Sequence, residues 1–393
     1  MTELKVDNII NLAGSGKPNL PVAPTVGSNA AISTLNTHSY TSSGTEPSSP
    51  KNGALWWDSA NDKVKVYIDG GFKEVELNSS SSSVDWKGTR GISFGGDDGS
   101  SGILNTIQYV NIPAGSGNST DFGDLTSARD ECKAASSGSR MICAGGALSN
   151  GTIINNIEYI ASATTANSTD FGDLETGKNA MSVCGDGTYG IFMGGRSQGG
   201  NDQGSNKIQR STIATAGNAT DFGDLTESNI RHSSSTNDTT RGVRCGGSNH
   251  AGSHTFTNVM DYITMANAGN ATDFGDLLQN LMFGQDGVIS DNTTGIFGGG
   301  YDTGFTDEDV IQKITIQTLG NATDFGDMIN GYGISIAGTT DGTTGVYLGG
   351  KSNQGNATNV ISKVTIATPG NATDFGDMLG NIRDNGSASG AAS

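Results

Sequence analysis

The sequence has few charged residues, few helix-forming residues and no long apolar runs. Charged residues make up 16% of its 393 residues and hydrophobic residues 33%, whereas about 25% charged is usual for a soluble domain. Glycine occurs 60 times, and because it is disfavoured inside helices, a helical bundle is excluded. No stretch approaches the roughly 20 apolar residues of a membrane-spanning helix. These absences leave an all-β protein or a disordered chain.

Positive charge and cysteine are also scarce. Lys and Arg number 22 against 40 Asp and Glu, which gives a formal charge of −18 at pH 7. An acidic surface repels phosphate, so we expect no nucleic-acid partner. The cysteines have no C-x-x-C spacing and fall in separate repeat units, so we expect neither a zinc site nor a disulfide framework. We interpret them as small buried side chains: Cys132, Cys143, Cys184 and Cys245.

One short motif recurs six times and sets the organisation of the chain. It reads N-S/A-T-D-F-G-D-L/M, and successive copies begin 49 to 52 residues apart. A period of about this length is typical of repeat arrays and propellers. The copies begin at Asn118, Asn167, Asn218, Asn270, Asn321 and Asn371.

Two further landmarks keep register with this motif. A short apolar run ends in Gly-Gly 24 to 26 residues before the first Asp of the motif, and a segment of alternating apolar and polar residues, such as N-T-I-Q-Y-V-N-I, lies between them. Alternation of this kind indicates a half-buried strand. Four short strands, A to D, in about 50 residues make one propeller blade. The sequence therefore predicts an all-β, six-bladed propeller, with the Gly-Gly leaving strand B where φ is positive or no side chain fits.

The motif Phe is the largest apolar residue in the second half of each unit, so we expect it to pack between adjacent blades. We place strand D around the T-D-F triplet and the neighbouring Asp and Gly in a turn, where Asp bonds its own backbone. The chain ends on a strand A without a strand B, so we expect residues 381–389 to pair with residues 89–96 and close the ring. Residues 82–88 are the alternative for that strand. The six copies of the Phe are Phe122, Phe171, Phe222, Phe274, Phe325 and Phe375.

The order of the landmarks resembles kelch repeats: a strand ending in Gly-Gly, an aromatic-containing strand, a bulky aromatic and, in three units, an Arg (Arg129, Arg231 and Arg383). Phe stands where kelch repeats usually have Trp, so the resemblance is to the architecture. With its G-N-A-T-D-F-G-D-L refrain, the array over residues 86–393 is similar to kelch-like arrays in structural proteins of tailed bacteriophages, particularly marine cyanophages. The resemblance implies a virion protein on the phage tail or particle surface, assembled in the host cytoplasm.

Residues 1–85 lack the repeat. Residues 1–50 read as an extended attachment and linker segment, because residues 14–53 are rich in Gly, Ser, Thr, Asn and Pro. Residues 51–85 contain a small β-meander that begins at Trp56 and Trp57 and has a hairpin signal at 69–71. The meander and the opening K-V-D-N-I-I-N-L-A-G-S-G resemble parts of phage tail and fibre proteins. That resemblance implies attachment to other virion proteins, and the small core leaves a homo-oligomer open.

No catalytic constellation is legible in the sequence. A sialidase-like propeller needs an Arg triad and a Tyr nucleophile, whereas the Arg residues here stand in unequal contexts. His250 and His254 lie in a Gly-containing loop, where no helix fixes their spacing, so we read them as loop residues rather than metal ligands. The repeated Asp residues lack the D-x-D-x-D run and closing Glu of a calcium loop. We therefore expect no enzyme activity, no cofactor and no metal.

The segments that follow Gly-Gly differ from unit to unit, whereas the loops between strands C and D nearly repeat. In an antiparallel blade all B–C loops emerge on one face of the ring, and diverse loops on a constant scaffold commonly form binding sites. Neutral drift in exposed loops is the competing explanation. Aromatic and basic residues stand out in these loops, and we take them as candidate receptor contacts: Arg196, His250, His254, Phe256, Tyr301, Phe305 and Lys351.

The expected function is that of a tail fibre or tail-associated adhesin whose propeller contacts a glycan or protein on the host cell surface. Its N-terminal region is expected to bind other virion or tail proteins. Two alternatives stay open: a purely structural protein that decorates the capsid or baseplate without binding a receptor, and a glycan-processing enzyme. No membrane insertion is expected.

Overall fold

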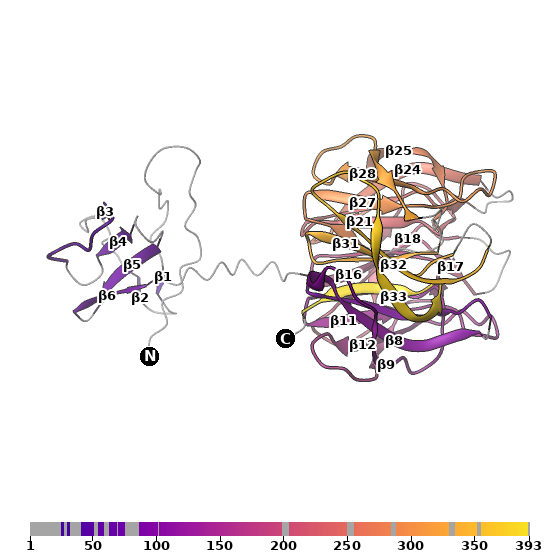
Figure 1. Ribbon diagram of the computed structural model, residues 1–393, viewed down its shortest axis with the longest axis horizontal. Helices are drawn as coiled ribbons and strands as arrows, with labels where there is room; N and C mark the ends of the chain where they lie inside the picture. The colour runs from indigo at the N-terminus through magenta and orange to yellow at the C-terminus, as the bar shows by residue number, and fades with distance from the viewer. Residues whose placement is uncertain are drawn as a thin grey trace. The chain divides into compact units, whose positions relative to one another are not determined.

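The computed structural model describes residues 86–391 except 101, 199–203, 250–254, 284–287, 330–334 and 352–354, and short N-terminal stretches at 25–26, 30–31, 41–50, 54–58, 63–68 and 70–74. The chain divides into two compact units, Met1–Ser83 and Val84–Ser393. None of the helical segments in these ranges has the length and apolarity to cross a membrane. The predicted all-β class is confirmed (Figure 1).

The second unit is a six-bladed β-propeller, as the sequence predicts. Each blade is an antiparallel sheet with its strands paired in the order A, B, C, D. We number the blades 1 to 6 in chain order: β34-β7-β8-β9 (Gly386–Gly390, Arg90–Asp97, Ile103–Asn111, Thr120–Asp124), β10-β11-β12-β13 (Lys133–Ser136, Arg140–Ala144, Asn156–Ala161, Thr169–Asp173), β15-β16-β18-β19 (Ser182–Gly185, Tyr189–Met193, Lys207–Thr212, Thr220–Asp224), β21-β22-β24-β25 (Ser234–Asn237, Arg241–Cys245, Thr255–Thr264, Thr272–Leu281), β26-β27-β28-β29 (Ile289–Ser290, Thr294–Gly298, Val310–Thr315, Thr323–Asp327) and β30-β31-β32-β33 (Ala337–Thr340, Thr344–Leu348, Thr358–Thr365, Thr373–Ile382).

Short elements extend some of the blades. In blade 3, β14 (Lys178–Asn179) pairs with β17 (Arg196–Ser197), and in blade 4, β20 (Ile230–Arg231) pairs with β23 (Ser248–Asn249). A 3-10 turn, η2 (Ile112–Ala114), follows strand C of blade 1. These additions lie at loop ends and leave the four-stranded pattern intact.

Blade 1 is assembled from both ends of the propeller sequence. β34 pairs antiparallel with β7, with Gly386 opposite Phe94 and Ser389 opposite Gly91. The C-terminus therefore supplies strand A of this blade, and in Figure 1 the yellow C-terminal strands lie beside the violet first blade. Because β34 is buried along its whole length, opening the ring requires breaking a buried ladder.

The inner strands A are built from small and polar residues. Three of them are buried at every position: K-A-A-S in blade 2, S-S-T-N in blade 4 and G-S-A-S-G in blade 1. Their side chains bond the backbone of the neighbouring inner strand. Ser387 Oγ donates to the Gly338 carbonyl at 2.6 Å, and Asn237 Nδ2 donates to the Gly185 carbonyl at 2.8 Å. Much of the Gly, Ser, Thr and Asn content is therefore packing material at the crowded centre of the ring.

Trp86 closes the axis at the end where strands A turn into strands B, which we call the A–B face. Its side chain is only 4% exposed, and together with Ser136 and Asn237 it lines a cavity of about 20 Å³. The next residues stay on this face, since Gly88 lies against Gly390. The chain therefore enters the propeller opposite the face that carries the B–C loops, which we call the B–C face.

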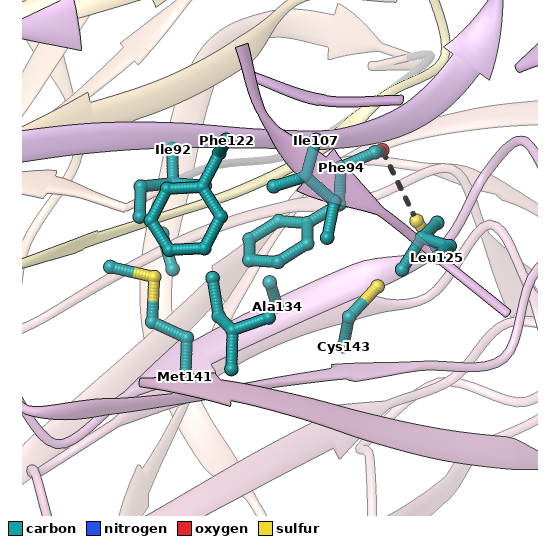
Figure 2. Close-up of a cluster of buried hydrophobic side chains, with 11 residues drawn as sticks. Ile92, Phe94, Ile107, Phe122, Leu125, Ala134, Met141 and Cys143 are labelled. Atoms are coloured by element: carbon teal, nitrogen blue, oxygen red, sulfur yellow. Dashed lines mark hydrogen bonds between the residues drawn. The ribbon is translucent and has the colours of Figure 1, made fainter. Parts of the chain in front are cut away.

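Apolar clusters fill the seams between blades, and each contains one copy of the motif Phe. At the first seam Phe122 of blade 1 lies in one cluster with Phe94 of its own blade and with Met141 and Ile160 of blade 2 (Figure 2). Every copy is at most 3% exposed. Burying an aromatic ring between two sheets joins the blades through the hydrophobic effect.

Two of the four cysteines lie together, contrary to the expectation that they fall in separate units. Cys132 directly precedes strand A of blade 2, and Cys143 lies in strand B of the same blade, so sheet pairing brings them into one cluster. Figure 2 shows Cys143 in this cluster, where the Cys132 thiol donates to the Phe94 carbonyl at 3.5 Å. All four cysteines are buried, as predicted.

The T-D-F triplets lie in the outer strands D, as predicted, but the following Gly and Asp belong to the same strands rather than to a turn, which corrects that expectation. Each of these segments pairs with strand C of its own blade and also bonds to the next blade, and both contacts keep it extended. At all six seams the Asn that opens one motif accepts, through Oδ1, a hydrogen bond of 3.0–3.2 Å from the backbone N–H of the second Asp of the preceding blade. We call these bonds the asparagine belt: Asp124–Asn167, Asp173–Asn218, Asp224–Asn270, Asp276–Asn321, Asp327–Asn371 and Asp377–Asn118.

The motif Gly makes this approach possible. A Cβ on Gly223 would lie 2.4 Å from the Gly269 carbonyl of the next blade, and the same atom at the other five motif glycines would lie 2.4–2.5 Å from the adjacent C–D loop. The C–D loops are therefore uniform because each forms half of a seam. The Gly-Gly pairs that end strands B have positive φ in all six blades, as predicted.

In the N-terminal unit, the predicted meander is formed by β4 (Leu55–Asp58), β5 (Lys63–Ile68) and β6 (Gly71–Glu74). The structure adds a strand that the sequence did not indicate, β3 (Thr41–Ser43), which runs parallel to β4. Buried Trp56 explains the addition, because its Nε1 donates to the Ser43 carbonyl at 3.0 Å. β1 (Thr25–Val26) and β2 (Ala30–Ala31) form a separate two-stranded pair.

Substituting Gly223 with Ala should destabilise the propeller. The new Cβ collides with backbone of the next blade, and overpacking of this kind costs about 1–3 kcal/mol or more. Gly217→Ala is the matched control in the same blade, because nothing lies within 4 Å of its Cβ position. Urea unfolding should show a lower midpoint for Gly223→Ala only. Equal midpoints for the two variants would contradict the role assigned to the motif Gly.

A chain that ends at Asn385 should be far less stable than the full-length chain. It lacks β34, so β7 loses its inner partner and Ser387 no longer bonds the neighbouring blade. The expected loss is several kcal/mol, a large part of the roughly 5–15 kcal/mol typical of a domain. A chain that ends at Ala391 keeps the strand and should melt like the full-length protein. If both truncations melt alike, closure by β34 does not stabilise the ring.

Candidate functional site

Three predicted contact residues, Tyr301, Phe305 and Lys351, meet on the B–C face of blades 5 and 6. Tyr301 and Lys351 occupy equivalent positions, each directly after the Gly-Gly that ends strand B. Backbone bridges hold both: Tyr301 pairs with Met282, and Lys351 pairs with Ala357. Two loops that are far apart in sequence are thus fixed side by side by the ring.

Phe305 presents its ring to solvent on a rigid loop. Its side chain is 61% exposed, and its φ of +58° lies in the left-handed region that a bulky residue rarely adopts. The loop is held by Asp302, whose Oδ1 accepts the N–H groups of Gly304 and Thr306 at 2.8 Å each. A left-handed, non-glycine conformation costs about 1–3 kcal/mol and is concentrated at functional sites.

Tyr301 is oriented by groups on both sides. Lys351 Nζ donates to the Tyr301 hydroxyl at 2.9 Å and lies 5.5 Å from the centre of its ring. Asp307 is the acidic neighbour. Partial burial raises the pKa of Asp307, and Lys351 and a hydrogen bond with Tyr301 counteract part of that rise. The Tyr301 hydroxyl therefore accepts a hydrogen bond from a cation and has a carboxylate nearby.

Phe256 belongs to the same aromatic cluster but not in the way expected. It lies in strand β24 of blade 4 rather than in a loop, and it is 6% exposed. The Phe305 ring packs edge-on against Phe256 at 5.3 Å and against Tyr301 at 6.4 Å between ring centres. Phe256 thus supports Phe305 from below and offers little surface to a ligand.

The remaining predicted contacts do not join this cluster. Arg196 lies in β17 and pairs with Asn179 at the other side of the B–C face, where its charge acts on Glu131. His250 and His254 lie outside the described residues. We call the group of Tyr301, Phe305, Asp307 and Lys351 the aromatic site.

The aromatic site offers a flat apolar ring next to a fixed cation, carboxylate and hydroxyl. Exposed aromatic rings with polar neighbours are the usual anchors of binding surfaces. The sequence signalled the aromatic and basic members but not Asp302 and Asp307, whose roles depend on the loop's folded shape. The D-T-G-F-T-D spacing, with Gly after an Asp, was the available turn signal.

Two other features of the described residues concern metal binding and surface depressions. No three His, Cys, Asp or Glu side chains among them are grouped to hold a metal ion. A depression of about 320 Å³ lies in the C–D loop of blade 1, beside Arg90, Tyr109 and Asn111. There the Arg90 guanidinium stacks on Tyr109 and donates to two carbonyls of blade 2, at 2.9 Å each, so its bonds join blades.

The sequence matches no protein-family model and no curated protein. The function is therefore argued from the propeller and its aromatic site.

Replacing Phe305 with Gly should leave the free energy of unfolding within about 1 kcal/mol of wild type. The loss of ring contacts, about 0.5–1.5 kcal/mol, is offset by relief of the left-handed backbone, of order 1 kcal/mol. Phe256→Gly, at the buried neighbour, should cost at least about 3 kcal/mol. Thermal unfolding of the two variants checks this. A large loss of stability for Phe305→Gly would make Phe305 a packing residue.

Proposed function

We propose that this protein is a binding protein of a tailed-phage particle, a tail fibre or tail-associated adhesin, and that the B–C face of its propeller contacts the host surface. The observation that carries the proposal is the aromatic site, where an exposed, strained Phe305 stands on a rigid loop. The phage assignment is supported by the resemblance of the refrain and of the N-terminal segment to phage virion proteins.

The C–D loops and the A–B face are already occupied by contacts within the propeller, which supports the choice of the B–C face. The C–D loops are engaged in the asparagine belt. The A–B face is occupied at the axis by Trp86 and the incoming chain. In five blades the first residue after Gly-Gly pairs with the segment between strand D and the next strand A. The B–C residues that follow differ in sequence from blade to blade, as recognition loops commonly do.

The proposed partners follow from the chemistry of the site. Phe305 suits the apolar face of a sugar ring or a peptide side chain, and Lys351 and Asp307 suit the polar groups around it. The formal charge of −18 opposes a charge-driven grip on an anionic envelope, so adsorption should depend only weakly on salt. The N-terminal region is proposed to attach to other virion proteins.

Tyr301→Ala and Phe305→Gly should each reduce adsorption of the full-length protein to host cells at least tenfold, since an aromatic anchor is commonly worth about 1–3 kcal/mol. Leu319→Ala is the matched control, because Leu319 is 55% exposed in the same blade but lies in a C–D loop. Cell-bound protein is measured by fluorescence at equal concentration. Equal loss with Leu319→Ala would show that the wrong face was chosen.

Labelling of intact particles tests the virion assignment separately. Antibodies against the propeller should mark the tail or the particle surface in electron micrographs of the phage that encodes the protein. Labelled particles combined with no adsorption by the full-length protein would favour a purely structural decorating role. Unlabelled particles would overturn the virion assignment.

A further inference from the structure

The C–D loops nearly repeat, but the loop of blade 1 is one residue longer than the others. Six residues separate Asn111, which ends β8, from the motif Asn118, whereas five residues separate strand C from the motif Asn in each of the other blades. The longer segment, I-P-A-G-S-G at 112–117, forms η2 and then turns at Gly115, whose φ is +74°. Blade 1 therefore carries a loop of its own shape at a position where the other blades agree.

Closure of the ring does not require the additional residue. The Gly117 N–H donates to the Phe375 carbonyl of blade 6 at 2.7 Å, and Asn118 keeps its place in the asparagine belt. The matching Gly217 N–H, from a five-residue loop, donates to the Phe171 carbonyl at 2.8 Å. The seam contacts are thus the same with either loop length. A departure from a repeated pattern that brings no structural gain is expected at functional sites.

The longer loop forms part of the wall of the depression of about 320 Å³ beside Arg90. Arg90 begins β7, Tyr109 lies in β8, and exposed polar residues of the loop and of β9 complete this part of the lining: Asn111, Ser116 and Thr120. Because these residues are exposed, solutes reach the depression. It lies at the end of blade 1 that carries the A–B and C–D connections, opposite the aromatic site.

The charge of the depression differs from that of the protein as a whole. Its lining contains Arg90 and no Asp or Glu, although the chain has 40 acidic residues against 22 Lys and Arg. A second cation stands beside it, since Lys363 Nζ of blade 6 donates to the Gly115 carbonyl in the same loop. Exposed charges more than about 8 Å away are screened at physiological salt, so these cations make the depression locally positive.

Arg90 keeps donors for a ligand. Its guanidinium lies 4.6 Å from the centre of the Tyr109 ring, and both of its carbonyl bonds, to Ser162 and Ala163, come from Nη1. Nε and Nη2 form no hydrogen bond with the residues that the structure describes. The stacked and bonded guanidinium is thus held in place, and a planar guanidinium edge matches two oxygens of a carboxylate or a sulfate.

We propose that this depression binds a sugar ring that carries an oxyanion, either a carboxylate as in a hexuronate or a sulfate ester. Arg90 binds the oxyanion, and Asn111, Ser116 and Thr120 suit the hydroxyl groups of the ring. The volume lies at the lower end of the roughly 300–1,000 Å³ usual for ligand sites, which suits a single sugar unit. This site lies on the opposite face from the aromatic site and does not rest on the proposed function.

Calorimetric titration of the full-length protein at physiological salt tests the proposal. Methyl glucuronide and methyl glucoside 6-sulfate are the probes, and saturable binding is expected for at least one; the tighter of the two identifies the oxyanion. Neutral methyl glucoside should bind at least tenfold more weakly, because a hydrogen bond to a charged group contributes about 1.5–3 kcal/mol. The peptide acetyl-Gly-Glu-Gly-amide, which has a carboxylate but no sugar hydroxyls, should also bind at least tenfold more weakly.

Arg90→Gln should weaken binding of the better probe at least tenfold. Arg140→Gln is the matched control, because Arg140 has the same position in blade 2, stacks 4.7 Å from the Tyr159 ring centre and donates to the Ala214 carbonyl at 2.7 Å. It does not line the depression. Both variants lose the same contact between blades, so only Arg90→Gln should change the affinity.

A loop exchange removes the wall of the depression and keeps Arg90. Residues 112–117 are replaced by residues 213–217, I-A-T-A-G, which hold the equivalent place in blade 3. Thermal unfolding should be unchanged, since the shorter loop makes the same seam bonds, and binding should fall at least tenfold. Unchanged affinity after the exchange, equal weakening by Arg140→Gln, equal binding of methyl glucoside or of the peptide, or no binding of either acidic sugar would overturn the proposal.

Discussion

The asparagine belt joins every blade of the propeller to the next. Each bond joins the side chain of one blade to the backbone of the blade before it, and a glycine in the preceding strand D permits the approach. The same contact occurs at every seam because the motif places the same Asn and Gly there. The repeated motif is therefore a repeated interface, and the ring closes when Asn118 meets Asp377.

This constraint divides the surface of the propeller into parts with different freedom. The motif strands and the C–D loops must keep their sequence, because they pair with the next blade. The A–B end of the axis is filled by small inner strands and by Trp86. The B–C loops differ in sequence from blade to blade, and the exposed aromatic site lies among them. The C–D loops on the outer seam are uniform because they contact the next blade, and the loops that vary in sequence therefore lie on the B–C face.

The inner strands are built from small and polar side chains. Six inner strands converge at the axis and leave little space there, which suits Ser, Thr, Asn and Gly, and Ser and Asn side chains bond neighbouring backbones. At two seams, a buried acid on strand C has its own buried Arg: Arg129 pairs with Glu158, and Arg244 pairs with Asp261. Such pairs are costly to break because either partner alone would be an uncompensated buried charge.

The blade count, the strand order and the packing role of the motif Phe could be predicted from the sequence alone, because they follow from a repeat period and from alternation along a single chain. It also indicated Tyr301, Phe305 and Lys351 as contrasting residues in polar loops. Two relations depend on the tertiary structure: these three residues converge with Phe256 beneath them, and Arg196 lies apart. Those relations join residues of different blades, and distances across the ring depend on how blades pack, which no local pattern encodes. The same reason explains the Gly and second Asp of the motif: strand D around the T-D-F triplet was expected, but the contact with the next blade that keeps these two residues in the strand is not visible in a single repeat.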